Sequence, residues 1–379
     1  MNLFHGVLGK MQFYVSHLLL VVTRTALRVS GLMFWVLVYI AALLSAASYI
    51  PDFLRLIARR PFTAFFWTSR KIAPHCLMSS SHGQHGYLRS KHSGIRFHYV
   101  ASGDKGSPLM LLLHGFPENW YSWRYQLDEF SHGYRTVAVD LRGFGSSDSP
   151  PDLQDYKIET LLQDVRDLIL GLEYSSCVLV GHDWGGTLAW TFSVHHSNMV
   201  DRLIVMNAPH PSAFHDYVLS HPSQLFLSRY VFLFQLPILP EILLSMCEFE
   251  YIRKPLTDPV LGIQNEKKRL TTEETEAFIY YISQKGALTA PLNYYRNIFG
   301  FFPMKAQDVL VPTLLLWGEN DAFLEAGMVP EMRQYIHAPF QTEIIPNASH
   351  WLQQDQPQVV NSIMRQFLNS DTNTMEQAH

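Results

Sequence analysis

The sequence predicts an α/β protein in which a mostly parallel sheet carries helices on both faces, with an inserted helical lid and an N-terminal transmembrane helix. Three observations predict this class. Short apolar runs alternate with helical patterns from residue 92 onward, which is typical of a parallel sheet. The alternation stops at residues 211–302, where only helical patterns occur. Residues 29–50 form an uncharged apolar run long enough to cross a bilayer.

The composition is poor in charge and limits the kinds of partner. Charged residues make up 16% of the 379 residues, against roughly 25% in an ordinary soluble domain. With 29 basic and 33 acidic residues, the formal net charge is −4, so we expect no nucleic-acid partner. Cys76, Cys177 and Cys247 form no C-x-x-C pair, so neither a disulfide framework nor a zinc site is predicted.

The charge deficit is largest near the N-terminus. No Asp or Glu precedes Asp52, and no charge occurs within residues 29–50, VSGLMFWVLVYIAALLSAASYI. As a helix they would span roughly 33 Å, enough for the hydrocarbon core of a bilayer. The alternative is a signal peptide cleaved at residues 45–48, but the apolar part of such a signal runs about 7–15 residues and begins nearer to the start. We therefore predict one uncleaved anchor at residues 29–50.

The segments beside the anchor bear on its orientation. Residues 1–28 are an N-terminal segment and residues 51–91 a membrane-proximal linker. More Lys and Arg residues follow the span than precede it, which favours a cytosolic position for the rest of the chain. We expect the anchor to lie in the endoplasmic reticulum membrane, and the orientation stays open.

The core is predicted in two parts, residues 92–210 and 303–370, separated by the lid at residues 211–302 and followed by a tail at residues 371–379. Near-continuous apolar strands suit a sheet that is covered on both faces. The predicted strands are residues 95–101, 109–113, 136–139, 178–180, 203–205 and 314–316. Helical apolar spacing occurs at residues 160–172, 186–194 and 358–367.

A tight turn after the strand at residues 178–180 presents Asp183. The motif is G-H-D-W-G at residues 181–185, followed by an apolar helix, and it has the form of a nucleophile elbow. Hydrolases of esters place Ser here. An Asp, with a pKa of about 3.9, is already an anion at neutral pH. A carboxylate suits displacement at an sp³ carbon, such as that of an epoxide or an alkyl halide. The alternative is an Asp that only caps the helix starting at Gly185.

A second turn is predicted to stabilise negative charge. The motif L-L-H-G-F-P at residues 112–117 places His114, Gly115 and Phe116 directly after an apolar strand. A turn at this place offers a backbone N–H to an oxyanion. The second donor would be the N–H of Trp184.

A carboxylate and a histidine complete the predicted site. Asp321 follows the strand at residues 314–316, and His350 lies in a loop before the last helix. The order of Asp183, Asp321 and His350 is nucleophile, acid, base. Asp321 would orient His350, whose imidazole would activate a water against an ester of the nucleophile. Glu319 is a rival for the acid, and His350 is one of eighteen histidines.

At these residues the sequence resembles the epoxide hydrolases of the α/β-hydrolase fold, and more closely the vertebrate membrane-anchored group, epoxide hydrolases 3 and 4. The resemblance covers about residues 92–368. It rests on three long motifs, LHGFPENWYSWRYQ at residues 113–126, GHDWGG at 181–186 and HWLQQDQP at 350–357. It implies that Asp183 is the nucleophile, that Asp321 and His350 are its relay, and that two lid tyrosines hold and protonate the epoxide oxygen.

The resemblance also indicates which tyrosines these are. Opening an epoxide leaves an alkoxide that needs a proton donor, and a Tyr hydroxyl with a pKa near about 10 can supply the proton. The family pattern Leu-Asn-x-Tyr-Arg falls on Tyr295, and a Tyr followed by Gln and Pro falls on Tyr230. Tyr281 and Tyr294 are competitors among eighteen tyrosines.

These features predict a membrane-anchored enzyme that converts lipophilic epoxides, such as fatty-acid epoxides from the bilayer, to vicinal diols. The reaction would use water and neither a metal nor an organic cofactor. A dehalogenase of the same fold is a rival, since it shares the Asp nucleophile and needs halide-binding N–H donors, for which Trp184 could serve. The second rival is a catalytically silent lipid-binding protein, against which the retention of every candidate residue argues.

Overall fold

The computed structural model describes residues 2–301 and 307–370. The predicted tail at residues 371–379 and the predicted lid boundary at residues 302–303 lie outside these ranges. An eight-stranded sheet of order β1-β2-β4-β3-β5-β6-β7-β8 forms the centre of the chain. Its strands are β1 (Gln84–Arg89), β2 (Arg96–Ser102), β3 (Leu109–Leu113), β4 (Arg135–Val139), β5 (Cys177–His182), β6 (Val200–Met206), β7 (Thr313–Gly318) and β8 (Phe340–Ile345).

The sheet is mostly parallel, as predicted. All neighbours from β4 to β8 pair in parallel, whereas β1 and β2 add an antiparallel edge. All six predicted strands are present. Strands β1 and β8 were not predicted, and β1 lies within the stretch 51–91 that was expected to be a linker. Its backbone pairs with β2 from Gln84 to Arg89, so the sheet begins before residue 92.

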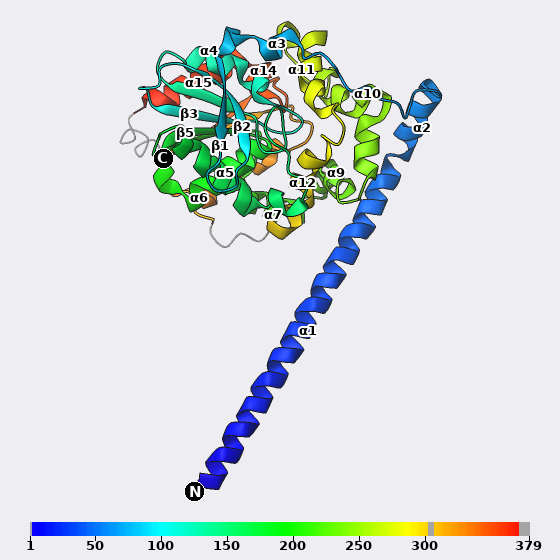
Figure 1. Ribbon diagram of the computed structural model, residues 1–379, viewed down its shortest axis with the longest axis vertical. Coiled ribbons are helices and arrows are strands. Elements are labelled where there is room, and N and C mark those ends of the chain that lie inside the picture. Colours follow the sequence, from blue (N-terminus) through cyan, green and yellow to red (C-terminus); the bar gives the residue numbers. More distant parts are fainter. Residues whose placement is uncertain (1, 302–306, 371–379) are drawn as a thin grey trace.

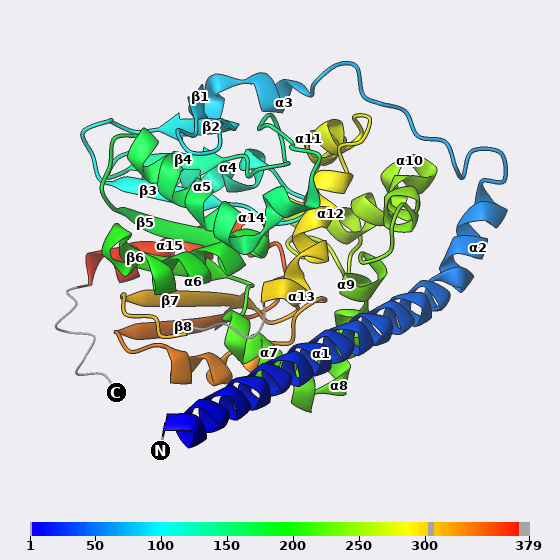
Figure 2. The ribbon, with the colours of Figure 1, turned by 60° about the horizontal axis from the view of Figure 1, so that its bottom comes forward.

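Helices cover both faces of the sheet (Figure 2). They are α4 (Arg124–Phe130), α5 (Ile158–Gly171), α6 (Trp184–His195), α14 (Leu352–Asp355) and α15 (Pro357–Asn369). Because side chains alternate along a strand, Leu111 of β3 joins the core under α5 and α6, whereas Leu112 joins the core under α4 and α15. The sequences of the strands between these layers are continuous apolar runs, because both faces of the sheet are buried.

The lid joins β6 to β7, and in its described residues it is helical. It consists of α7 (Pro211–Ser220), α8 (Pro222–Leu227), α9 (Arg229–Leu233), α10 (Leu239–Thr257), α11 (Thr272–Ile282), α12 (Thr289–Arg296) and α13 (Ile298–Phe301). Figure 2 shows α9, α10, α11 and α12 together beside one end of the sheet. The loops that follow β3, β5 and β7 reach the same end and face the lid.

The N-terminal part of the chain is a long helix that projects from the molecule (Figure 1). Helix α1 (Asn2–Ser48) is followed by α2 (Ile50–Arg59) and, further along, by α3 (His75–Met78). The stretch Val22–Arg59 has 38 residues and a mean hydropathy of 2.1 in its most apolar window, so it has the length and composition to cross a membrane. This apolar stretch therefore extends on both sides of the predicted span at residues 29–50, whereas α1 itself ends within the span at Ser48.

The end of this helix is packed on the lid. Val38, Ala42 and Ser45 are buried there, one residue per turn along one side of α1. The Ser45 hydroxyl donates a hydrogen bond of 2.7 Å to the carbonyl of Arg229, the first residue of α9. Most other side chains of this part of α1 are exposed and apolar, so one stripe of the helix belongs to the protein core and the remainder does not.

Candidate active site

Asp183 lies on a strained turn between β5 and α6. Its φ of 50° and ψ of −120° are unfavourable for a residue with a side chain. The turn is closed by glycines, because a Cβ on Gly181 would lie 2.3 Å from the carbonyl oxygen of Gly185. Asp183 occupies the N-cap position of α6, but its side chain makes no capping hydrogen bond. Its carboxylate instead points away from the helix, as in a nucleophile elbow.

One carboxylate oxygen of Asp183 is held by the turn after β3. The N–H of Phe116 donates a hydrogen bond of 2.8 Å to Asp183 Oδ1. Gly115 permits this approach, because a Cβ there would lie 2.4 Å from the Cβ of Asp183. His114 holds the turn from behind, since its Nε2 accepts a hydrogen bond from the N–H of Leu141. Trp184 begins α6, so its N–H has no partner within the helix.

His350 lies between two carboxylates. Its Nδ1 is 2.7 Å from Asp321 Oδ2, and its Nε2 is 3.6 Å from Asp183 Oδ2. Its side chain is 4% exposed and that of Asp321 is fully buried. Glu319, the rival acid, is exposed and accepts a hydrogen bond from the N–H of Asn347 instead. The structure thus brings the three predicted residues together and keeps Glu319 apart from them.

The charges of this cluster shift the pKa values of His350 and Asp183. Burial lowers the pKa of His350, but the charges of Asp321 and Asp183 outweigh it and raise the pKa to about 10. Burial raises the pKa of Asp183, yet the adjacent His350 ring and its charge bring the pKa below its usual value. At neutral pH the resting site therefore holds an ionised Asp183 beside a protonated His350.

Asn207 is a member of the site that the sequence analysis did not identify. It follows β6 with a positive φ of 44°, and its Nδ2 donates a hydrogen bond of 2.7 Å to Asp321 Oδ2. The other oxygen, Asp321 Oδ1, accepts from the N–H groups of Phe323 and Leu324. Three hydrogen bonds thus fix the carboxylate that orients His350. The available signal was a polar residue directly after an apolar strand of the parallel sheet.

Glu118 is a second member that was not identified, although it lies within the H-G-F-P-E motif. It is buried and accepts hydrogen bonds from the N–H of Gly115 at 3.0 Å and from His182 Nδ1 at 2.8 Å. Its other oxygen accepts from the side-chain amides of Gln353 and Gln354. One carboxylate therefore connects the Phe116 turn, the residue before the nucleophile and the segment after His350.

His182 connects Glu118 to the backbone of His350. Its Nε2 lies 2.8 Å from the carbonyl oxygen of His350, and its Nδ1 faces Glu118. Both ring nitrogens thus face acceptors. Burial raises the pKa of Glu118, but the interaction with His182 outweighs it and lowers the pKa below its usual value. His182 also contributes to the lowered pKa of Asp183.

The predicted tyrosines face the nucleophile from the lid. Tyr230 on α9 and Tyr295 on α12 line the same cavity as Asp183, with their ring centroids 5.9 Å apart. Burial and the charge of Asp183 raise the pKa of both hydroxyls, so both stay protonated. The competitors are engaged elsewhere: the Tyr294 hydroxyl donates to the carbonyl of Arg142, and that of Tyr281 accepts from Ser146.

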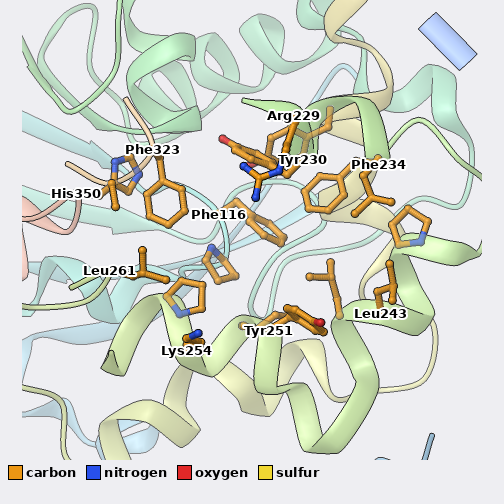
Figure 3. Close-up of a pocket in the computed structure, with 18 of the residues that line it drawn as sticks. Phe116, Arg229, Tyr230, Phe234, Leu243, Tyr251, Lys254, Leu261, Phe323 and His350 are labelled. Atoms are coloured by element: carbon orange, nitrogen blue, oxygen red, sulfur yellow. The ribbon is translucent and has the colours of Figure 1, made fainter. Parts of the chain in front are cut away.

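The cavity has a volume of about 410 Å³ and lies between the lid and the sheet. Figure 3 shows His350 and Phe323 on one side of it, Phe116 and Tyr230 near its centre, and Tyr251 and Leu243 on a farther wall. Its walls are largely apolar, apart from the catalytic candidates and two cationic residues, Arg229 and Lys254. Within residues 2–301 and 307–370, no cluster of three His, Cys, Asp or Glu side chains is placed to hold a metal ion.

The fold is that of the α/β hydrolases, and the site presents a carboxylate at the turn where these hydrolases carry their nucleophile. A family model described as alpha/beta hydrolase fold matches residues 108–235, which include strands β3 to β6, the Phe116 turn and the elbow. This match covers the first part of the core and the beginning of the lid.

Individual relatives show to which family of the α/β hydrolases the chain belongs. The chain is 76% identical over 361 residues to epoxide hydrolase 3 of Xenopus tropicalis, covering 95% of this chain and 98% of that protein. It is 48% identical to human epoxide hydrolase 4 over 349 residues, covering 92% and 96% of the two. A crystal structure of a mutant Bacillus megaterium epoxide hydrolase with its product, (R)-3-[1]naphthyloxy-propane-1,2-diol, matches with a TM-score of 0.68 and 34% identity, covering 75% of this chain and all of that one. The chain belongs to the epoxide hydrolases of the α/β-hydrolase fold.

Proposed function

We propose that this protein hydrolyses lipophilic epoxides to vicinal diols through a covalent ester of Asp183. The observation that carries the proposal is the arrangement of two protonated tyrosines opposite an ionised carboxylate in one apolar cavity. Ring opening needs both groups at once, because a nucleophile attacks carbon while an acid protonates the departing oxygen. The diol bound in the Bacillus megaterium relative is a product of the same class.

In the first step, Asp183 Oδ2 attacks the less hindered ring carbon. This oxygen is the one that Phe116 leaves free, since the N–H of Phe116 holds Oδ1. The carbon–oxygen bond of the ring breaks, and the oxygen takes a proton from Tyr230 or Tyr295. Hydroxyl donors at this place support an epoxide substrate over an alkyl halide, whose leaving halide would need N–H donors.

In the second step, His350 becomes a base. Esterification removes the charge of Asp183, which is one of the two charges that keep the His350 ring protonated. The pKa of the ring falls, and its extra proton replaces the one that the tyrosine lost. The neutral Nε2 then takes a proton from water, and the hydroxide attacks the ester carbonyl, whose oxygen is Asp183 Oδ1.

The end of the cycle restores the resting state. The N–H of Phe116, and that of Trp184 beside it, stabilise the negative charge on the carbonyl oxygen. The intermediate expels the diol as an alkoxide, which takes the proton of the carboxylic acid formed at Asp183, so that the cycle ends with an ionised Asp183 beside a protonated His350. Asp321 keeps the ring oriented throughout through its contact with Nδ1.

The N-terminal helix supports a membrane location for this reaction. We infer that residues 29–50 are an uncleaved single-pass anchor in the endoplasmic reticulum membrane. Cleavage at residues 45–48 would remove Val38, Ala42 and Ser45 from their buried positions on the lid. The anchor would hold an apolar cavity near a supply of apolar substrate, and fatty-acid epoxides are the class that we propose.

Trapping of the intermediate tests the mechanism. We expect Asp183→Asn to form no diol from a fatty-acid epoxide, because the amide is not a nucleophile. We expect His350→Gln to accumulate the covalent ester, which intact-protein mass spectrometry detects as a mass increase equal to that of the epoxide. Diol formation by both variants at the wild-type rate would contradict the proposal.

A further inference from the structure

Arg229 is a cation of the cavity wall that the proposed mechanism does not use. It begins α9 directly before Tyr230, and both residues line the cavity. Figure 3 shows Arg229 beside Tyr230, with Lys254 across the cavity next to Leu261. The catalytic steps need neither cation, so the presence of Arg229 in an apolar wall calls for a separate reason.

The guanidinium of Arg229 has few polar partners within the protein. Its Nη1 donates a hydrogen bond of 3.0 Å to the carbonyl of Phe226. Its Nε is buried without a hydrogen bond partner in the described part of the chain. Other arginines in and beside the lid are neutralised, since Arg296 pairs with Glu241 and Arg142 with Asp164. No such pair involves Arg229 among residues 2–301 and 307–370.

Aromatic rings hold the guanidinium in place. Its central carbon lies 4.2 Å from the ring centroid of Phe226 and 5.1 Å from that of Tyr49. Tyr49 follows the last residue of α1 and also lines the cavity, so the N-terminal helix contributes directly to this wall. Rings contact a guanidinium through its flat face, which leaves its N–H edge for another ligand.

A half-buried cation without a counter-charge is unfavourable unless a ligand supplies one. A guanidinium presents parallel N–H donors whose spacing matches the two oxygens of a carboxylate. A long-chain epoxide with an acid group has both features that this cavity accommodates, an apolar chain and one terminal carboxylate. Lys254 is exposed and has no such support, so it is the weaker candidate.

We propose that Arg229, held by Tyr49 of the N-terminal helix, binds the carboxylate of an epoxy fatty acid and makes the cavity prefer the free acid to its neutral ester. The proposal rests on the proposed function and adds the group that recognises the acid end of the substrate. It also gives the N-terminal helix a part in substrate recognition.

The test compares the epoxide of oleic acid with the epoxide of methyl oleate as substrates of the full-length protein in neutral detergent. We expect Arg229→Gln to raise KM for the acid about tenfold more than KM for the ester, because hydrogen bonds to a charged group are lost. Arg229→Lys keeps the positive charge but lacks the parallel N–H donors of a guanidinium. It should therefore give an intermediate ratio of the KM values for acid and ester. Lys254→Gln is the matched control, and it should keep the wild-type ratio of the two KM values.

Two outcomes would overturn the proposal. Equal changes for acid and ester in Arg229→Gln would make Arg229 a support for the N-terminal helix alone. Loss of the acid preference in Lys254→Gln instead would assign the carboxylate to the opposite wall. A second measurement, the binding of stearic acid and methyl stearate followed by tryptophan fluorescence, needs no turnover. It tests Arg229 even if wild-type protein hydrolyses no epoxide, which would be a failure of the proposed function and not of this inference.

Discussion

In the proposed mechanism, His350 holds a proton in the resting site and releases it once Asp183 is esterified. The structure gives a physical cause for this change, because the ring contacts one carboxylate that persists and one that loses its charge. Asp321 is fixed by Asn207 and two backbone N–H groups, so its influence is constant through the cycle. Asp183 is the variable partner, at 3.6 Å from Nε2.

Replacement of Asp183 by Asn imitates the neutral ester and tests this change. In the wild type, the pKa of His350 is raised to about 10, so the ring is protonated at neutral pH. We expect Asp183→Asn to lower this pKa, because only Asp321 then opposes the effect of burial. Histidine NMR titration measures the value, with His350→Gln used to assign the signal. An unchanged pKa of His350 in Asp183→Asn would contradict the proposal that His350 becomes a base once Asp183 loses its charge.

Glu118 is a residue whose importance could not be predicted from the sequence alone. A Glu in a loop motif ordinarily lies in solvent, and only the fold encloses it among His182, Gly115 and two glutamines. Asn207 was missed for the same reason, since its partner Asp321 is far away in the sequence. That Asp183, Asp321 and His350 lie together could be predicted, because their motifs are local and their chain order is informative.

Removal of the charge of Glu118 should destabilise the protein and slow the reaction. Glu118→Gln removes a buried carboxylate that accepts hydrogen bonds from Gly115, His182 and two glutamines, which costs about 3 kcal/mol of unfolding free energy. Since the folded-state pKa of Glu118 is lowered, its stabilisation is present above the unfolded value of about 4.3 and is lost as the pH falls through the folded value. Denaturant unfolding at neutral and acidic pH measures this difference.

An exposed carboxylate provides the control for that experiment. Glu343 on β8 is exposed, so Glu343→Gln should change the unfolding free energy by less than about 0.5 kcal/mol at either pH. If Glu118→Gln behaved like Glu343→Gln, the three-way connection through Glu118 would not stabilise the site.

At the scale of elements, buried strands and edge strands differ in how well the sequence predicts them. The buried strands were predicted because continuous apolar runs mark them. β1 and β8 were not, because each is an edge strand with mostly exposed side chains. Their sequences, QHGYLR and FQTEII, lack an apolar run. Their pairing depends on backbone groups of the neighbouring strand, which a reading of side chains does not detect.

The contact between α6 and β3 gives a prediction at this scale. A Cβ on Gly185 would lie 2.1 Å from the carbonyl oxygen of Leu113, and neither backbone can move without displacing the elbow or the sheet. We expect Gly185→Ala to lower the unfolding free energy by about 3 kcal/mol or more. Gly106→Ala is the matched control, since nothing lies within 4 Å of its Cβ. Thermal unfolding and soluble yield compare the two, and equal values would contradict the close approach.

At the scale of the whole molecule, the expected division into an anchor, a core and a lid is incomplete, because the C-terminal part of α1 and the segment after it are attached to the lid. Ser45 bonds to the start of α9, and Phe34 packs edge-on against Phe299 of α13 at 5.9 Å. Further on, the N–H of Cys247 in α10 donates to the carbonyl of Ala64. Hydropathy predicted the apolar helix, but it could not predict that one stripe of the helix packs against protein.

That stripe offers a test of whether the N-terminal helix supports catalysis or only tethers the protein. Ala42 is fully buried on the lid side of α1, whereas Leu44 is 67% exposed. We expect Ala42→Phe to push α1 away from α9 and to shift Tyr230, which α9 carries. Overpacking of this kind costs about 1–3 kcal/mol, so kcat/KM for a neutral epoxide should fall by about tenfold. Leu44→Phe adds a ring of the same size on the exposed side of the helix, and should retain wild-type kcat/KM in the same detergent. Equal activity of the two variants, with both proteins folded by circular dichroism, would mean that catalysis is independent of the packing between α1 and the lid.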